Sequence, residues 1–366
     1  MRFNNNQKAF FALLQAGLWE KEVRLAPLGT VDYQEVMRLS EEQSVVGLVT
    51  AGLEHVVDMA VPKVNLLQFI GQTLQIEEQN KAMNYFIGVV VDAMRKEKIH
   101  TTLIKGQGVA QCYERPLWRT SGDVDFFLDE DNYDEAKVFF AKMCSSVEPE
   151  KEETKHIGFT VDPWLVELHA TMHFGLSKRV DRVIDEVRKS IFQLGGIRTW
   201  HNEGTDVFLP DADNDIIIVF THFLGHFLFG GVGLKQMCDV CRLVWTYKDG
   251  IRTWLLKQRL NEAGLMSEWK VFAAVAVDWL GMPAEVMPFY DSSAGYRRKA
   301  RRAFAKMMKD GNMGHNTEDS GGMKKLARRF TEYLQLTMIF PLDAHRFFVN
   351  YLIDKVRIRR ARKRNK

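Results

Sequence analysis

The spacing of hydrophobic residues changes twice along this chain of 366 residues, and the changes restrict the folds that it can adopt. Up to about residue 98, and again from about residue 211, apolar residues recur at the intervals of amphipathic helices. Between these regions, short β-branched and aromatic segments alternate with helical ones, as in a small sheet covered by helices. The sequence therefore predicts an α+β protein, with a small mixed-sheet core flanked by N-terminal and C-terminal helical regions.

The predicted organisation has four parts along the chain. They are an N-terminal helical region at 1–98, an α/β core at 99–210, a C-terminal helical region at 211–354 and a basic tail at 355–366. Strands of the core are predicted at 101–104, 123–128, 157–161, 164–169, 197–200 and 206–209. Helices are predicted at 107–113 and 133–143. Asp162-Pro163 separates two of the strands and is typical of a hairpin turn.

The sequence offers no clear membrane or secretion signal. The first residues are polar and lack the apolar segment of a signal peptide. The longest apolar run, 216–234, contains His222, His226 and four glycines, so we interpret it as a buried helix followed by a turn. Four cysteines in a chain of this length fit a reducing compartment better than a disulfide scaffold. We therefore expect a cytoplasmic protein without membrane contact.

Positive charge is concentrated at the C-terminal end. The formal net charge is +3, and residues 355–366 carry eight basic side chains and no acidic one. Such runs are usually solvated, but they also attract polyanions without reading a sequence. The tail is therefore a candidate contact for nucleic acid, while the rest of the chain is mildly acidic.

Acidic side chains recur on two of the predicted strands. Side chains alternate between the faces of a strand, so Asp123 and Asp125 share one face, and Glu167 and His169 share one face of a later strand. If the two strands are neighbours, three carboxylates converge on one point. Their mutual repulsion is relieved by a shared cation, and oxygen ligands suit Mg²⁺. An Asp-x-Asp pair by itself is also compatible with an exposed edge strand.

The residues that flank the first two aspartates favour a phosphate site. Lys105-Gly106 ends the preceding strand, and glycine lets backbone amides approach a phosphate closely. Arg119, Ser121 and Gly122 come just before Asp123, where they could bond to a triphosphate.

These segments together resemble a known family, over about residues 101–173. The segments are Leu103-Ile104-Lys105-Gly106, a short helix with Tyr113, Arg119-x-x-Gly122-Asp123-Val124-Asp125-Phe126, and Glu167-Leu168-His169. In this combination they resemble the core of the bacterial nucleotidyltransferases of the polymerase-β superfamily. The resemblance implies a nucleotidyltransferase fold, a nucleoside triphosphate donor and a hydroxyl acceptor of unspecified kind: a small molecule, RNA or protein. ATP is the default donor because of its abundance.

The resemblance also implies a two-metal mechanism. Asp123 and Asp125 would bind two Mg²⁺ ions, with Mn²⁺ as an alternative, and Glu167 would bind the ion that activates the acceptor hydroxyl. The residues expected to contact the nucleotide are Lys105, Gly106, Gln107, Arg119, Ser121 and Gly122. A later predicted helix adds Lys235 and Asp239 as second-rank candidates for the wall of the site.

One departure from the superfamily leaves an alternative open. The glycine is usually followed by Ser or Gly and lies closer to the first aspartate, whereas here Gly106 is followed by Gln107 and then by fifteen residues before Asp123. The alternative is a nucleotide-binding or interaction protein that keeps the fold without turnover. Retention of all three carboxylates favours the enzyme, since a binding module has little need of a costly acidic cluster.

Other histidines and cysteines allow different interpretations. His169 could assist proton transfer or orient Glu167. His222 and His226 share a helix face, as in zinc hydrolases, but Phe223 stands where those enzymes carry Glu, so a buried helix face is the preferred interpretation. Cys238 and Cys241 lack two further ligands at zinc spacing and are predicted to be core residues.

Overall fold

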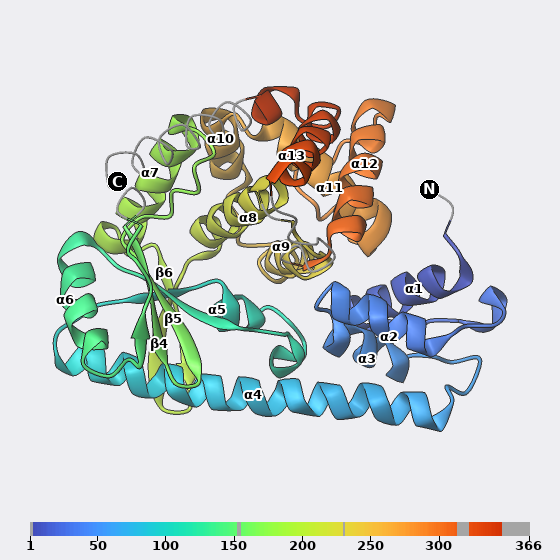
Figure 1. The fold of residues 1–366 in the computed structure, drawn as a ribbon, viewed down its shortest axis with the longest axis horizontal. Coiled ribbons are helices and arrows are strands. Elements are labelled where there is room, and N and C mark those ends of the chain that lie inside the picture. The colour runs from blue at the N-terminus through green and yellow to red at the C-terminus, as the bar shows by residue number, and fades with distance from the viewer. Residues whose placement is uncertain (1–2, 152–154, 230, 313–321, 346–366) are drawn as a thin grey trace.

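The computed structural model describes residues 3–151, 155–229, 231–312 and 322–345. In Figure 1 a sheet lies at the left, the N-terminal helices lie at the right, and the C-terminal helices lie above both. The predicted α+β class, with a small mixed sheet and flanking helical regions, is confirmed. The basic tail at 355–366, with its predicted nucleic-acid contact, lies outside the described residues.

The main sheet has five strands in the order β1-β2-β5-β4-β3. The strands are β1 (Thr102–Ile104), β2 (Asp123–Phe127), β3 (Ser146–Val147), β4 (His156–Val161) and β5 (Trp164–His169). Only β2 and β5 run parallel, and the other neighbours are antiparallel. The sequence predicted the ends of β1, β2, β4 and β5 to within two residues. The two-residue β3 was not predicted, because both of its side chains are exposed and give no hydrophobic pattern.

Alternation along β2 directs its two faces into different cores. Val124 and Phe126 pack with one hydrophobic cluster, together with residues of α4 (Lys63–Lys96) and α6 (Glu130–Ala141). Phe127 is on the opposite face and packs with the larger cluster, which also holds α7 (Lys178–Gln193) and α8 (Ala212–Phe229). Asp123 and Asp125 share the face of Phe127, so the carboxylates point toward the C-terminal helices.

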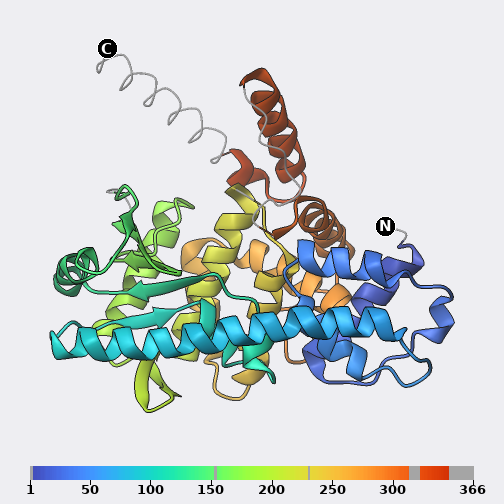
Figure 2. The same cartoon turned by 60° about the horizontal axis from the view of Figure 1, so that its bottom comes forward.

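Helix α4 links the N-terminal helices to the sheet. In Figure 1 this helix of 34 residues runs beneath both, and in Figure 2 it crosses in front of them. Near its start, Phe69 packs in the larger core, and further along Met83, Ile87 and Met94 are buried in the core of the sheet. The helix therefore contributes to two hydrophobic cores.

The N-terminal helices are α1 (Asn5–Trp19), α2 (Tyr33–Glu42) and α3 (Val46–Glu54), and the short turn η1 (Ala26–Leu28) lies between α1 and α2. Helices α1 and α3 approach each other closely at glycines. A Cβ atom at Gly17 would lie 1.8 Å from the Leu48 carbonyl oxygen, and one at Gly52 would lie 2.0 Å from the Leu13 carbonyl oxygen. Any larger residue at either position would force the two helices apart.

The second half of the chain is helical after a hairpin. Strands β6 (Ile197–Asn202) and β7 (Thr205–Pro210) form a separate two-stranded sheet. After α8 the helices are α9 (Leu234–Thr246), α10 (Thr253–Ala263), α11 (Met266–Leu280), α12 (Ala294–Asp310) and α13 (Gly322–Thr337). Gly264 and Gly281 adopt positive φ at the ends of α10 and α11, where glycine ends a helix without strain.

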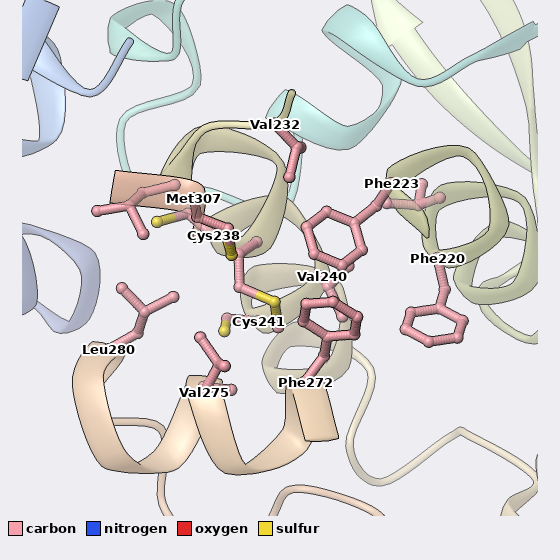
Figure 3. Close-up of a cluster of buried hydrophobic side chains, with 14 of the residues drawn as sticks. Phe220, Phe223, Val232, Cys238, Val240, Cys241, Phe272, Val275, Leu280 and Met307 are labelled. Atoms are coloured by element: carbon pink, nitrogen blue, oxygen red, sulfur yellow. The ribbon is translucent and has the colours of Figure 1, made fainter. Parts of the chain in front are cut away.

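Helices α8, α9 and α11 form a dense apolar core, shown in Figure 3. Phe223 and Phe272 meet edge to face in this core, at 4.6 Å between ring centroids. Cys238 and Cys241 point into it and are fully buried, and burial raises the pKa of both thiols. The prediction that they are core residues is confirmed. Among the described residues, no helix combines the length and hydrophobicity that crossing a bilayer requires.

Candidate functional site

Strands β2 and β5 bring three carboxylates together. The two strands pair in parallel, and Asp125 lies directly opposite Glu167 in the register. Ligand oxygens of Asp123, Asp125 and Glu167 lie within 4.8 Å of one another. This spacing is what a shared divalent cation requires, because one ion contacts oxygens at roughly 2.0–2.6 Å.

Lys105 supplies the positive charge nearest to the carboxylates. It comes directly after β1, and its Nζ lies 2.7 Å from Asp125 Oδ1. Burial alone would lower the pKa of Lys105, but the charges of Asp125 and Asp123 more than offset burial and raise it. The residue holds a positive φ of 56°. A non-glycine residue in this region of φ is strained, and such strain is concentrated at functional sites.

Two histidines on the same face of the sheet contact the carboxylates. His169 Nε2 lies 2.8 Å from Asp125 Oδ1, and His156 Nε2 lies 3.1 Å from Glu167 Oε2. The two imidazoles stack with their centroids 4.5 Å apart, because His156 and His169 are paired across β4 and β5. Burial would raise the pKa of Glu167, but the contacts with His156 and His169 hold it well below its usual range.

The charge of the cluster fits a divalent cation. Asp125 and, after it, burial raise the pKa of Asp123, as expected where carboxylates repel each other. Three carboxylates and the single ammonium of Lys105 leave a formal charge of −2 before the histidines are counted. The donor set is made of oxygens, which Mg²⁺ and Mn²⁺ prefer. The residues present therefore fit the predicted metal.

The turn before β2 is held in place by a buried ion pair. Arg119 donates from Nε and Nη2 to the two oxygens of Asp239 on α9, at 2.7 Å each, and from Nη1 to Ser121 Oγ at 2.8 Å. Tyr113 also donates its hydroxyl to Asp239. This fork geometry fixes the segment from Arg119 to Gly122 against α9.

A cavity of about 400 Å³, hereafter the first cavity, opens on this turn and on the carboxylates. Predicted site residues that line it are Lys105, Gly106, Arg119, Ser121, Gly122, Asp123, Asp125, Glu167, Lys235 and Asp239. Gly106 has a φ of 36°, and a Cβ atom there would lie 3.4 Å from the Asp123 carbonyl oxygen. Burial, and next the charge of Arg119, lower the pKa of Lys235 to about 8. Residues from distant parts of the sequence thus line the first cavity together.

Comparison with known proteins identifies the family. Residues 29–281 match the family described as "Uncharacterised nucleotidyltransferase". The chain belongs to this nucleotidyltransferase family. The matched residues include both carboxylate strands and α9, and the resemblance predicted from the motifs is confirmed. No curated protein matches the chain.

One solved structure is similar to this nucleotidyltransferase family member. It is an antigenic nucleotidyltransferase-like protein from Paracoccidioides brasiliensis, with 13% sequence identity and a TM-score of 0.33. The match covers 54% of this chain and 92% of that chain.

Gln107 does not reach the first cavity of the nucleotidyltransferase. Its side chain is buried and donates to Asn80 Oδ1 of α4 at 2.6 Å. The residue thereby ties α5 (Gly106–Ala110) to the long helix. Its side chain is therefore not assigned to the nucleotide.

A second cavity, of about 550 Å³, adjoins the first. The two cavities share Lys105, Glu167, His222 and His226 in their walls. His169 lines only the second cavity. Sequence reasoning did not place His156, His222 or His226 in the site, since only strand register and helix packing bring them there. The short spacing of His222 and His226, four residues apart on an apolar helix, was the one available signal.

The two histidines of α8 contact each other. Their Nε2 atoms are 3.0 Å apart, and Lys105 Nζ lies 3.4 Å from His222 Nε2. Burial first, and then the charge of Lys105, lower the pKa of both imidazoles. Among the described residues, neither histidine belongs to a group of three side chains that could hold a metal ion. The geometry therefore gives a zinc hydrolase no support.

Proposed function

We propose that this family member transfers a nucleoside monophosphate from a nucleoside triphosphate to an acceptor hydroxyl. The observation that carries the proposal is the meeting of Asp123, Asp125 and Glu167 within 4.8 Å in the wall of a cavity. In the reaction, the acceptor oxygen forms a bond to the α-phosphorus of the donor. The bond from this phosphorus to the oxygen that bridges to the β-phosphate breaks, and pyrophosphate leaves.

Asp123, Asp125 and Glu167 would hold the metal ions, which we propose to be two Mg²⁺, with Mn²⁺ as a substitute. When bound, such ions polarise the α-phosphate and favour ionisation of the acceptor hydroxyl. The chain itself supplies rigid ligands: Asp125 is only 2% exposed and is fixed by contacts with both Lys105 and His169. Rigid, pre-formed ligands reduce the reorganisation that the reaction requires.

The triphosphate is proposed to lie in the first cavity, with ATP as the default donor. Lys105 and Lys235 would supply positive charge to the phosphates, and Ser121 a hydroxyl donor. A Cβ atom at Gly122 would meet nothing within 4 Å, which leaves its backbone open to a ligand. Arg119 forms an ion pair with Asp239, so its proposed role is to hold the turn in position and to add a buried positive charge.

Proton transfer is proposed to involve the histidines. His169 contacts Asp125 at 2.8 Å and Glu167 at 3.5 Å, which supports the predicted orienting role better than a role as proton acceptor. His226 lines both cavities, and its lowered pKa keeps the imidazole neutral near pH 7. A neutral imidazole can accept the acceptor's proton, and we assign that role to His226.

The experiment is label transfer by the purified full chain. The protein is incubated with each of four α-³²P-labelled nucleoside triphosphates, Mg²⁺ and cell extract, with Asp123→Asn as the matched variant. We expect label on an acceptor and release of pyrophosphate, both dependent on metal and both lost in the variant. Nucleotide binding without transfer, in every extract tried, would instead support the non-catalytic alternative.

A further inference from the structure

The second cavity lies on the other side of Glu167 from the proposed triphosphate site. Glu167 borders both cavities, and so do Lys105, His222 and His226. A group bound in the second cavity would therefore reach the same carboxylate that the first cavity presents to the α-phosphate. A transfer between two substrates requires that both be held close together, and two cavities that share one carboxylate provide this arrangement.

The walls of the two cavities differ in charge. In the first cavity, three cations and two histidines face four carboxylates. The cations are Lys105, Arg119 and Lys235, the histidines are His222 and His226, and the carboxylates are Asp123, Asp125, Glu167 and Asp239. In the second cavity, two lysines and five histidines face Glu167 as the sole carboxylate among the described lining residues. Imidazole and ammonium groups donate hydrogen bonds, so this wall favours an anion or a ligand rich in acceptor oxygens.

The basic side chains of the second cavity come from separate elements that hold them in place. The backbone of Lys151 pairs with His156, its amide donating to the His156 carbonyl at 2.8 Å. His173, just after β5, contacts Asp185 of α7 at 2.8 Å. His222 meets Phe174 edge to face, with centroids 5.0 Å apart. The basic groups thus surround the cavity from β4, β5 and α8.

We propose that the second cavity binds the acceptor, and that the acceptor is a small alcohol carrying a phosphate group. This inference rests on the proposed function and adds the class of substrate. The volume of about 550 Å³ falls within the range of roughly 300–1,000 Å³ that small-molecule sites occupy. The hydroxyl lies next to Glu167 and His226, and the phosphate lies toward Lys151 and His173.

Gly225 of α8 lies close to Phe174 in the wall of the second cavity. A Cβ atom at Gly225 would lie 3.3 Å from Phe174 Cβ, and both residues line only the second cavity. A side chain at position 225 would therefore reduce this cavity while leaving the lining of the first unchanged.

The test measures binding of matched alcohols to the full chain. The donor site is first filled with α,β-methylene-ATP and Mg²⁺, so that phosphate probes cannot enter it. Glycerol 3-phosphate is then compared with glycerol, and ribose 5-phosphate with ribose, by calorimetry and saturation-transfer NMR. We expect at least one phosphorylated probe to bind about tenfold or more tightly than its neutral partner, a difference of about 1.4 kcal/mol.

Two variants test whether the probe binds in the second cavity. Lys151→Glu should weaken binding of the phosphorylated probe about tenfold, and Gly225→Val should weaken it as well. Lys142→Glu is the matched control, because it reverses an exposed lysine that lines neither cavity, and it should leave binding unchanged. Circular dichroism and melting temperature establish that each variant is folded.

Several results would overturn the inference. These are equal binding of neutral and phosphorylated probes, no binding of any probe to the nucleotide complex, or unaltered binding by Lys151→Glu. Label transfer found solely on RNA or protein would also overturn it. Failure of the proposed function is recognised separately, because the label-transfer experiment would then give no labelled acceptor even though α,β-methylene-ATP and Mg²⁺ bind in the first step.

Discussion

The two cavities on either side of Glu167 are built in different ways. In the first, positive and negative side chains are already paired, as in Lys105 with Asp125 and Arg119 with Asp239. In the second, the polar wall consists mainly of imidazoles and lysines. This difference supports our proposal that the first cavity binds a ligand that carries both positive and negative charge, such as a metal–triphosphate complex. The second suits a ligand that brings negative charge alone.

The largest effect is expected at Asp125, the most buried carboxylate of the first cavity. Asp125→Asn should reduce nucleotidyl transfer by about 1,000-fold, which corresponds to about 4 kcal/mol, because a charged metal ligand becomes a neutral amide. Transfer rates at saturating nucleotide measure this. The control Asp134→Asn alters an exposed aspartate of α6 and should retain full activity. Retention of more than a tenth of the activity in Asp125→Asn would contradict the assignment.

A large effect on stability is expected at the pair that holds the first cavity's turn. Asp239→Ala leaves Arg119 buried without its partner, which should cost about 3–5 kcal/mol in the free energy of unfolding. Urea titration followed by circular dichroism measures the loss. The double variant Arg119→Met with Asp239→Leu removes both charges and should be more stable than Asp239→Ala. If the single and double variants were equally unstable, the charge argument would fail.

A moderate effect is expected on the pH dependence of nucleotide binding. The pKa of Lys235 is lowered to about 8, so its ammonium is charged below that pH and loses its charge as the pH rises. Affinity for α,β-methylene-ATP should therefore fall about five- to tenfold between pH 7 and 9.5. Lys235→Arg keeps its charge over this range and should show a flatter profile, measured by calorimetry. A fall of the same size in both proteins would assign the pH effect to another group.

The smallest effect on the first cavity is expected from a change in the second. Gly225→Val should alter nucleotide affinity by less than about twofold, since position 225 does not line the first cavity. Transfer to the acceptor should nevertheless fall, because the second cavity becomes narrower. Equal losses of nucleotide binding and of transfer would show that the two cavities do not act separately.

The strands and the carboxylates could be predicted because their signal is local. A period of two residues places Asp123 and Asp125 on one face whatever the rest of the chain does. The motif resemblance suggested that β2 and β5 are neighbours, and their register then places Asp125 opposite Glu167. Lys235 and Asp239 were predicted as site residues from the family resemblance alone.

The second cavity could not be predicted in this way. His156 faces the site only because β4 pairs with β5 in one particular register. His222 and His226 reach it only because α8 packs over the carboxylate face of the sheet, and their apolar surroundings in sequence resembled an ordinary core helix. Gln107 was expected at the phosphates, but α4 passes beside it and accepts its hydrogen bond through Asn80. Such contacts depend on tertiary packing between distant segments.

The most direct measurement of the central claim is a crystal structure of the full chain with α,β-methylene-ATP and Mn²⁺. Anomalous scattering from manganese should appear between Asp123, Asp125 and Glu167, with oxygen distances of about 2.2 Å. The triphosphate should lie in the first cavity beside Lys235. Manganese found elsewhere, or an ordered nucleotide with no ion at these three carboxylates, would contradict the account.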